Sequence, residues 1–102
     1  MQLYYLITKS DTESIRFGKT EIQMFSQNVA KGFDTWEEVK KALSEEVEKR
    51  TSNPERYTTL WIHRDDSGRV KSASFKEPEF HEDYFGHKYR SVEEIFIVKA
   101  VV

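Results

Sequence analysis

The chain of 102 residues contains no cysteine, and this absence excludes several classes of protein. Without cysteine there is no disulfide scaffold, no thiol catalysis, and no zinc or iron–sulfur site with Cys ligands. Small secreted domains are often rich in disulfides, so the composition favours a reducing compartment. We therefore expect a cytoplasmic protein.

Glycine and long apolar runs are also scarce. Gly18-Lys19-Thr20 is similar to the end of a phosphate-binding loop, but Glu13 occupies the position of its first glycine. The apolar stretch Leu3–Ile7 is too short for a signal peptide or a membrane span. The sequence thus predicts no nucleotide cofactor and no membrane association, and no motif in it is specific enough to name a family.

Charge is nearly balanced, with a formal net value of −2. Its distribution is uneven, because residues 56–76 are mainly basic and residues 77–83 carry acidic side chains without a lysine or arginine. A basic patch beside an acidic one suits protein partners at least as well as a phosphate backbone.

The apolar fraction is modest at 37%, and aromatic residues make up 14% of the chain. Large rings help a small polar chain to build a core, since each buries about 150–250 Å². At this length we expect a single domain over residues 1–102.

The clearest element is a helix over Trp36–Arg50. Its apolar positions recur at helical spacing on one narrow face: Trp36, Val39, Leu43 and Val47. Asp34 and Thr35 each precede a glutamate by three residues, which gives two overlapping capping boxes. Glu46 and Arg50 form one of several i,i+4 ion pairs, and Pro54 marks the end.

Several segments alternate as strands do: Gln2–Thr8, Tyr57–Arg64, Arg69–Phe75 and Val92–Val102. The second and third form a hairpin across a turn at residues 65–68, where Gly68 is free to adopt a positive φ. The first and last are apolar on both faces, which places the first inside a sheet and the last in the middle of a sheet or at a subunit contact.

Residues 20–31 fit two structures. Ile22, Phe25 and Val29 lie on one helical stripe behind a T-x-x-Q capping box, which favours a second short helix. The same residues also suit a strand over Glu21–Ser26, in a hairpin with Ile15–Phe17. We expect an α+β fold, with a mostly antiparallel sheet of about four strands and the Trp36–Arg50 helix packed on one face.

The segment Lys76–Arg90, KEPEFHEDYFGHKYR, is rich in aromatic and charged residues and shows no clean period. Connections this long are often functional, and Tyr, Phe and Arg dominate interface hot spots. We therefore predict a protein-binding surface formed by Phe80, His81, Tyr84, Phe85, His87 and Tyr89.

Two alternatives use other residues. A nucleic-acid interface would use the basic hairpin, with Arg64, Arg69 and Lys71 beside Trp61 as a stacking surface. A small enzyme or metal site would use His81 and His87 with neighbouring carboxylates. Their spacing does not match H-E-x-x-H, because Phe85 holds the position of the second histidine.

No catalytic constellation, metal site or cofactor site is predicted. The sequence favours a small non-enzymatic protein that binds a macromolecular partner, most simply a protein, as regulator, adaptor or inhibitor. Small motif-free proteins of this kind also occur among the products of phages and mobile elements. A homodimer through Val92–Val102 is a further expectation, since an exposed apolar strand can pair with its own copy.

Overall fold

The computed structural model describes residues 2–16 and 19–101, without the side chains of residues 2, 16 and 19–27. Its elements are β1 (Gln2–Arg16), β2 (Lys19–Phe33), α1 (Trp36–Thr51), β3 (Thr58–Arg64), β4 (Val70–Lys76), β5 (His81–Glu82) and β6 (Lys88–Val101). Among the residues described, no helix is long and apolar enough to cross a bilayer.

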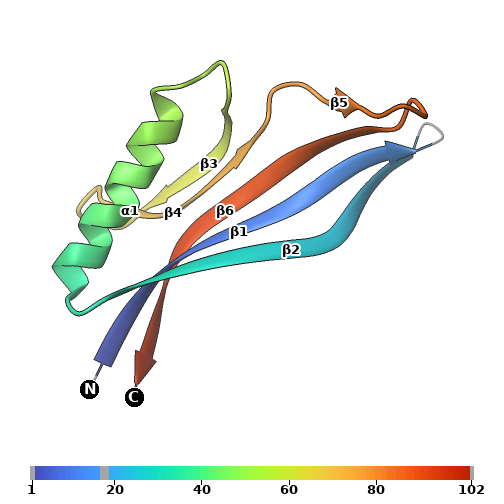
Figure 1. Ribbon diagram of the computed structural model, residues 1–102. Helices are drawn as coiled ribbons and strands as arrows, with labels where there is room; N and C mark the ends of the chain where they lie inside the picture. The colour runs from blue at the N-terminus through green and yellow to red at the C-terminus, as the bar shows by residue number, and fades with distance from the viewer. Residues whose placement is uncertain (1, 17–18, 102) are drawn as a thin grey trace.

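All strands join one antiparallel sheet in the order β2-β1-β6-β4-β3, and the short β5 pairs with the beginning of β6. The helix α1 covers one face of this sheet near the chain ends (Figure 1). The fold is therefore α+β, as the sequence predicts.

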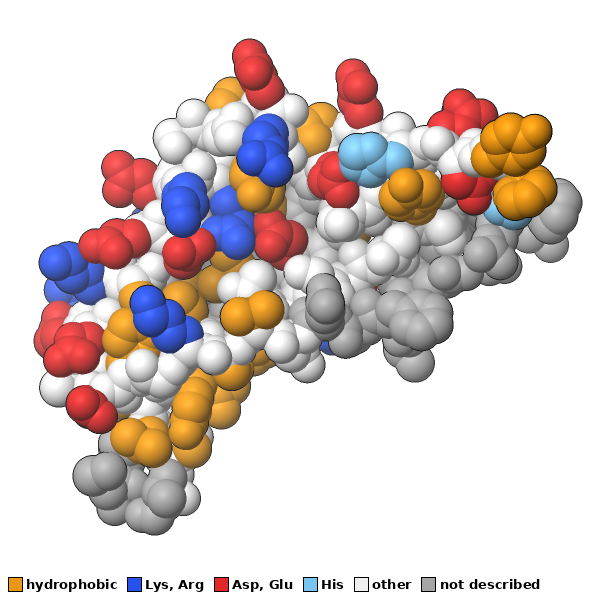
Figure 2. Space-filling view, in the orientation of Figure 1, with side chains coloured by type: hydrophobic (Ala, Val, Ile, Leu, Met, Phe, Trp, Pro, Cys, Tyr) orange, Lys and Arg blue, Asp and Glu red, His pale blue; other side chains and the backbone are white. Residues whose placement is uncertain are grey.

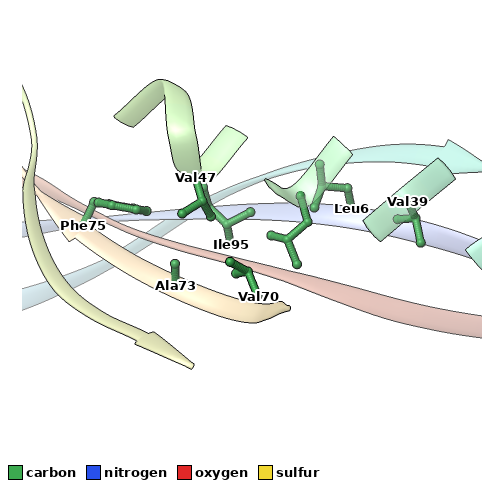
Figure 3. Packing of buried hydrophobic residues seen from close by; sticks show 8 residues of the cluster. Leu6, Val39, Val47, Val70, Ala73, Phe75 and Ile95 are labelled. Carbon is green, nitrogen blue, oxygen red and sulfur yellow. The ribbon is translucent and has the colours of Figure 1, made fainter. Parts of the chain in front are cut away.

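The core lies between α1 and the sheet. Val39, Leu43 and Val47 of the helix are buried, and they meet buried residues from the three strands β1, β4 and β6: Leu6, Val70, Ala73, Phe75 and Ile95 (Figure 3). The hydroxyl oxygen of Thr35 accepts a hydrogen bond of 3.2 Å from the Glu38 backbone N–H and caps the helix. The predicted helix over residues 36–50 is confirmed.

The C-terminal end of α1 is fixed to β6 by Arg50. Its Nε donates to Oε1 of Glu93 over 2.9 Å, and its Nη1 donates to Oε2 of Glu46 over 2.8 Å. The guanidinium also lies 5.5 Å from the centre of the Tyr57 ring. The Arg50 side chain is only 10% exposed, so this polar cluster closes one end of the core.

The strands β1, β2 and β6 continue far beyond the helix (Figure 1). We call this extension the arm: residues 11–16 of β1, 19–27 of β2, and residues 80–91, which contain β5 and the beginning of β6. The other described residues form the body. Every buried apolar residue that the structure describes belongs to the body. In the arm, Arg90 Nε donates to Oε2 of Glu13 over 2.9 Å, which ties β6 to β1.

The sheet has six strands, so the predicted count of about four is wrong. The preferred second helix over residues 20–31 is also wrong, because β2 pairs with β1 along most of its length. The strand alternative is the better one, although residues 17–18 of its hairpin lie outside the described residues. An apolar stripe in a short segment suits either period, and cross-strand pairing decides here.

Candidate partner-binding surface

The aromatic segment 76–90 does not form one long connection. It contains β5 and the beginning of β6, which form a hairpin at the far end of the arm. The expectation of a loop is therefore wrong. Its aromatic residues break the polar–apolar alternation by which strands are recognised, and β5 is only two residues long.

The turn of this hairpin spans Asp83–His87 and is closed by its own hydrogen bonds. The backbone N–H of Asp83 donates to the His87 carbonyl over 2.9 Å, and that of Gly86 donates to the Asp83 carbonyl over 3.1 Å. Asp83 Oδ1 accepts from the N–H groups of Phe85 and His87 at 2.9 Å each. Gly86 takes a φ of 79°, which favours glycine. The tip of the arm is thus an ordered turn.

Tyr84 and Phe85 occupy the two central positions of this turn and project into solvent. Tyr84 is 97% exposed and Phe85 is 79% exposed. Their ring centres lie 5.5 Å apart, and the rings meet edge to face. Figure 2 shows hydrophobic side chains at this end of the molecule, next to acidic ones. We call Tyr84 and Phe85 the aromatic tip.

Asp83 stays ionised in this turn. Desolvation favours its neutral form, but the N–H groups of His87 and Phe85 outweigh that effect and hold its pKa below the ordinary value. His87 Nδ1 lies 3.3 Å from Asp83 Oδ2. The charge beneath the aromatic tip is therefore negative at neutral pH.

Of the other four predicted residues, His87 ends the turn itself, and the rest lie at the base of the hairpin or behind it. Tyr89 is 42% exposed, and its ring centre lies 5.5 Å from that of the His81 ring. Phe80 lies beneath the guanidinium of Arg90, which is 4.2 Å from its ring centre. Phe80 thus packs within the arm, while the aromatic tip stands clear of it.

A second turn in the chain has the same hydrogen bonds. In Asp65–Arg69, the Asp65 N–H donates to the Arg69 carbonyl over 2.8 Å, and Gly68 N–H donates to the Asp65 carbonyl over 2.9 Å. Asp65 Oδ1 accepts from the N–H groups of Ser67 and Arg69 at 2.9 and 3.0 Å. Gly68 has a φ of 85°. The pattern Asp-x-x-Gly therefore builds both turns, with Asp66 and Ser67 where the arm carries Tyr84 and Phe85.

The residues of the predicted nucleic-acid interface are divided between the two faces of the sheet. Arg69 pairs with Glu37 of α1 over 3.2 Å, and Arg64 donates to the Gly68 carbonyl of its own turn. Trp61 stacks on His63 at 4.3 Å, and strand register places it on the sheet face opposite α1. Lys71 directly precedes Ser72, which lies on the same face as Trp61. Strand alternation therefore places Lys71 on the other face, where it is exposed.

His81 and His87 contact separate carboxylates, those of Glu77 and Asp83. His81 Nε2 contacts Glu77 Oε2, at the wall of an open groove of about 630 Å³. Desolvation works against ionisation of Glu77, but hydrogen bonds from His81 and the Ser91 N–H hold its pKa below the ordinary value. Glu77 is thus a weak base that ties the β4–β5 connection to β6. In the described ranges, no three His, Asp or Glu residues are grouped to hold a metal ion.

The repeated Asp-x-x-Gly turn was readable from the sequence and is the signal that identifies the aromatic tip.

Comparisons of the chain with protein-family models, with curated proteins and with solved structures find no match.

Proposed function

We propose that this protein is a non-enzymatic binding module that engages a protein partner through the aromatic tip of its arm, as a regulator, adaptor or inhibitor. The comparison of the two turns supports this proposal. The Asp65–Arg69 turn forms the same hydrogen bonds with two polar central residues, so the turn itself does not require Tyr84 and Phe85.

Exposing two large rings also has a cost in solvation. Full burial of such a side chain stabilises by about 1.5–3 kcal/mol, and the aromatic tip forgoes most of this in the isolated chain. Rigid aromatic side chains on an ordered turn lose little conformational entropy on binding. This is the composition and geometry of an interface hot spot.

The charge near the tip favours a protein over a nucleic acid. Glu82 and Asp83 are exposed next to the aromatic tip, and their carboxylates would repel a phosphate backbone. A partner surface with an apolar pocket and basic residues around it would fit this end of the arm.

The Asp65–Arg69 turn supplies the residues with which Tyr84 and Phe85 can be replaced to test the proposal. The double change Tyr84→Asp/Phe85→Ser gives the arm turn the central residues of the Asp65–Arg69 turn. We expect partner affinity to fall by about 100-fold, as for a hot-spot pair. The free energy of unfolding should change by no more than about 0.5 kcal/mol. The matched control is Asp66→Ala/Ser67→Ala, which we expect to bind normally.

Partners are captured by photo-crosslinking from a benzophenone side chain placed at Phe85, and affinities of the recovered partner are then measured by titration calorimetry. Equal affinity of the wild type and the Tyr84→Asp/Phe85→Ser variant would refute the assignment of the tip. A partner recovered equally from a benzophenone at Ser67 would refute it as well.

A further inference from the structure

The sheet face opposite α1 is apolar along its two central strands. Leu6 belongs to the core beneath the helix, so its neighbours in β1 point to the other side of the sheet. Register pairs Leu3 with Ala100, Tyr5 with Val98 and Ile7 with Phe96 on that side. We call these six residues the open face. Val98 is 41% exposed, and within the described part of the chain no layer covers the open face.

The strands beside the open face carry small residues. Ala30 and Gly32 of β2 lie next to Ile7 and Tyr5. Ser72 of β4 lies next to Phe96. The Tyr5 ring lies over Gly32, where an added Cβ would be 3.4 Å from its Cε1 atom. The surface is therefore continuous. Its large side chains, with small residues beside them, can interdigitate with the side chains of another pleated sheet.

The charges on this side of the sheet lie towards the arm and are balanced in sign. Lys9 is the register partner of Glu94 and lies 4.0 Å from Asp11. Lys76 is the register partner of Val92 in the next row. The whole chain has a net charge of only −2. Two copies that meet through this face would thus experience little electrostatic repulsion.

The size of the face also suits a dimer. Together with the flanking residues of β2 and β4 and the Lys9–Glu94 row, the open face forms a patch of four strands about 4.8 Å apart over eight residues of about 3.3 Å each, a flat area of about 500 Å². Side-chain relief raises the accessible area above this value, towards the roughly 800 Å² per partner of a standard interface. We propose that two copies of this chain pack open face against open face in a two-fold symmetric dimer.

In this dimer the two sheets form the inner layers and the two α1 helices the outer ones. The contact is isologous, so each side chain of the open face enters the interface twice. The expected pairing of strand edges through Val92–Val102 is not open over residues 92–96, because β6 is hydrogen-bonded there to β1 on one side and to β4 on the other. The proposal is independent of the aromatic tip, which lies on the arm.

The first test is the mass in solution, by light scattering and sedimentation over a wide range of concentrations. We expect the wild type to reach twice the mass of one chain. Val98→Lys places a charge in the open face and should weaken dimerisation by at least about 100-fold, because two lysines are buried together. The matched control is Val29→Lys, since Val29 is also exposed, at 65%, but register with Thr8 places it on the α1 side.

A wild type that stays monomeric throughout would overturn the proposal, as would a Val98→Lys variant that dimerises as tightly as the wild type. A second measurement does not depend on the folding of that variant. Because the chain has no cysteine, a single Phe96→Cys or Val98→Cys can be joined to its own copy by a bis-maleimide of about 10 Å, the spacing of packed sheets. Efficient coupling there, and none at Val29→Cys, supports the dimer; equal coupling at all three positions refutes it.

Discussion

At the end of α1, Arg50 is held by carboxylates from two elements, and its partners differ in how visible they are in the sequence. Glu46 lies four residues earlier on the same helix and is predicted from spacing. Glu93 is 43 residues away and meets Arg50 only because β6 lies under the helix. Burial disfavours the charged guanidinium, but the hydrogen bonds from Arg50 to both carboxylates raise its pKa above the ordinary value.

We expect Arg50→Ala to lower the free energy of unfolding by about 3 kcal/mol, because it leaves Glu93, whose side chain is 15% exposed, without its partner. The matched control is Arg69→Ala, which breaks the exposed pair with Glu37 and should cost less than about 1 kcal/mol. Urea unfolding followed by Trp fluorescence measures both. Similar losses for the two variants would contradict a special role for Arg50.

At the scale of the elements, substitutions in the two Asp-x-x-Gly turns distinguish the stability of the arm from that of the whole fold. Alanine at either glycine meets no clash, since the nearest atom to an added Cβ is 3.6 Å away at Gly86 and none lies within 4 Å at Gly68. The cost, about 1–2 kcal/mol in each turn, comes from the positive φ. The turns differ in what they close: one joins β3 to β4 in the body, and the other lies at the end of the arm.

We expect Gly68→Ala to lower the midpoint of global unfolding and Gly86→Ala to lower it much less. The buried apolar residues that the structure describes lie in the body, so the end of the arm can open while the core persists. Gly86→Ala should instead accelerate amide hydrogen exchange at His81 and Glu82. Asparagine, which tolerates positive φ, is the control at both sites. Equal shifts of the midpoint would show that arm and body unfold as one unit.

The success of sequence reasoning also differs between elements. The helix over residues 36–50 was predictable because capping boxes, period and a proline all agree on it. The β3–β4 hairpin was predictable because its turn residues lie between two alternating runs. The extent of β2, and β5 itself, depended on pairing with the neighbouring strand of a hairpin, which the pattern of a single segment does not record. Composition alone made Tyr84 and Phe85 candidates, but their exposure required the turn geometry.

For the molecule as a whole, stability should fall in acid. Four carboxylates spread from the helix to the tip have pKa values below their ordinary ones: Glu46, Asp65, Glu77 and Asp83. A group with a lower pKa in the folded state binds protons more readily when unfolded, so its stabilisation is complete at neutral pH and is lost as pH falls.

We therefore expect the free energy of unfolding to decline from about pH 4.5 downwards, where unfolded carboxylates begin to bind protons. Urea unfolding at a series of pH values measures this decline. Asp65→Asn removes the group that the Ser67 hydroxyl and the Lys40 ammonium keep ionised, so its profile should be shallower than that of the wild type. A profile that is flat down to pH 3 would contradict this expectation.

The extended shape of the chain changes how its size appears in solution. The molecule measures 50 × 29 × 20 Å, and its radius of gyration of 15.7 Å exceeds the roughly 13 Å of an average globular chain of this length. A single chain should therefore diffuse slowly and elute early from a sizing column, as a heavier compact protein would. If their arms point the same way, two copies packed open face to open face add to a short dimension and leave the 50 Å length almost unchanged. Hydrodynamic volume would then grow less than mass, so elution position discriminates poorly between one chain and two.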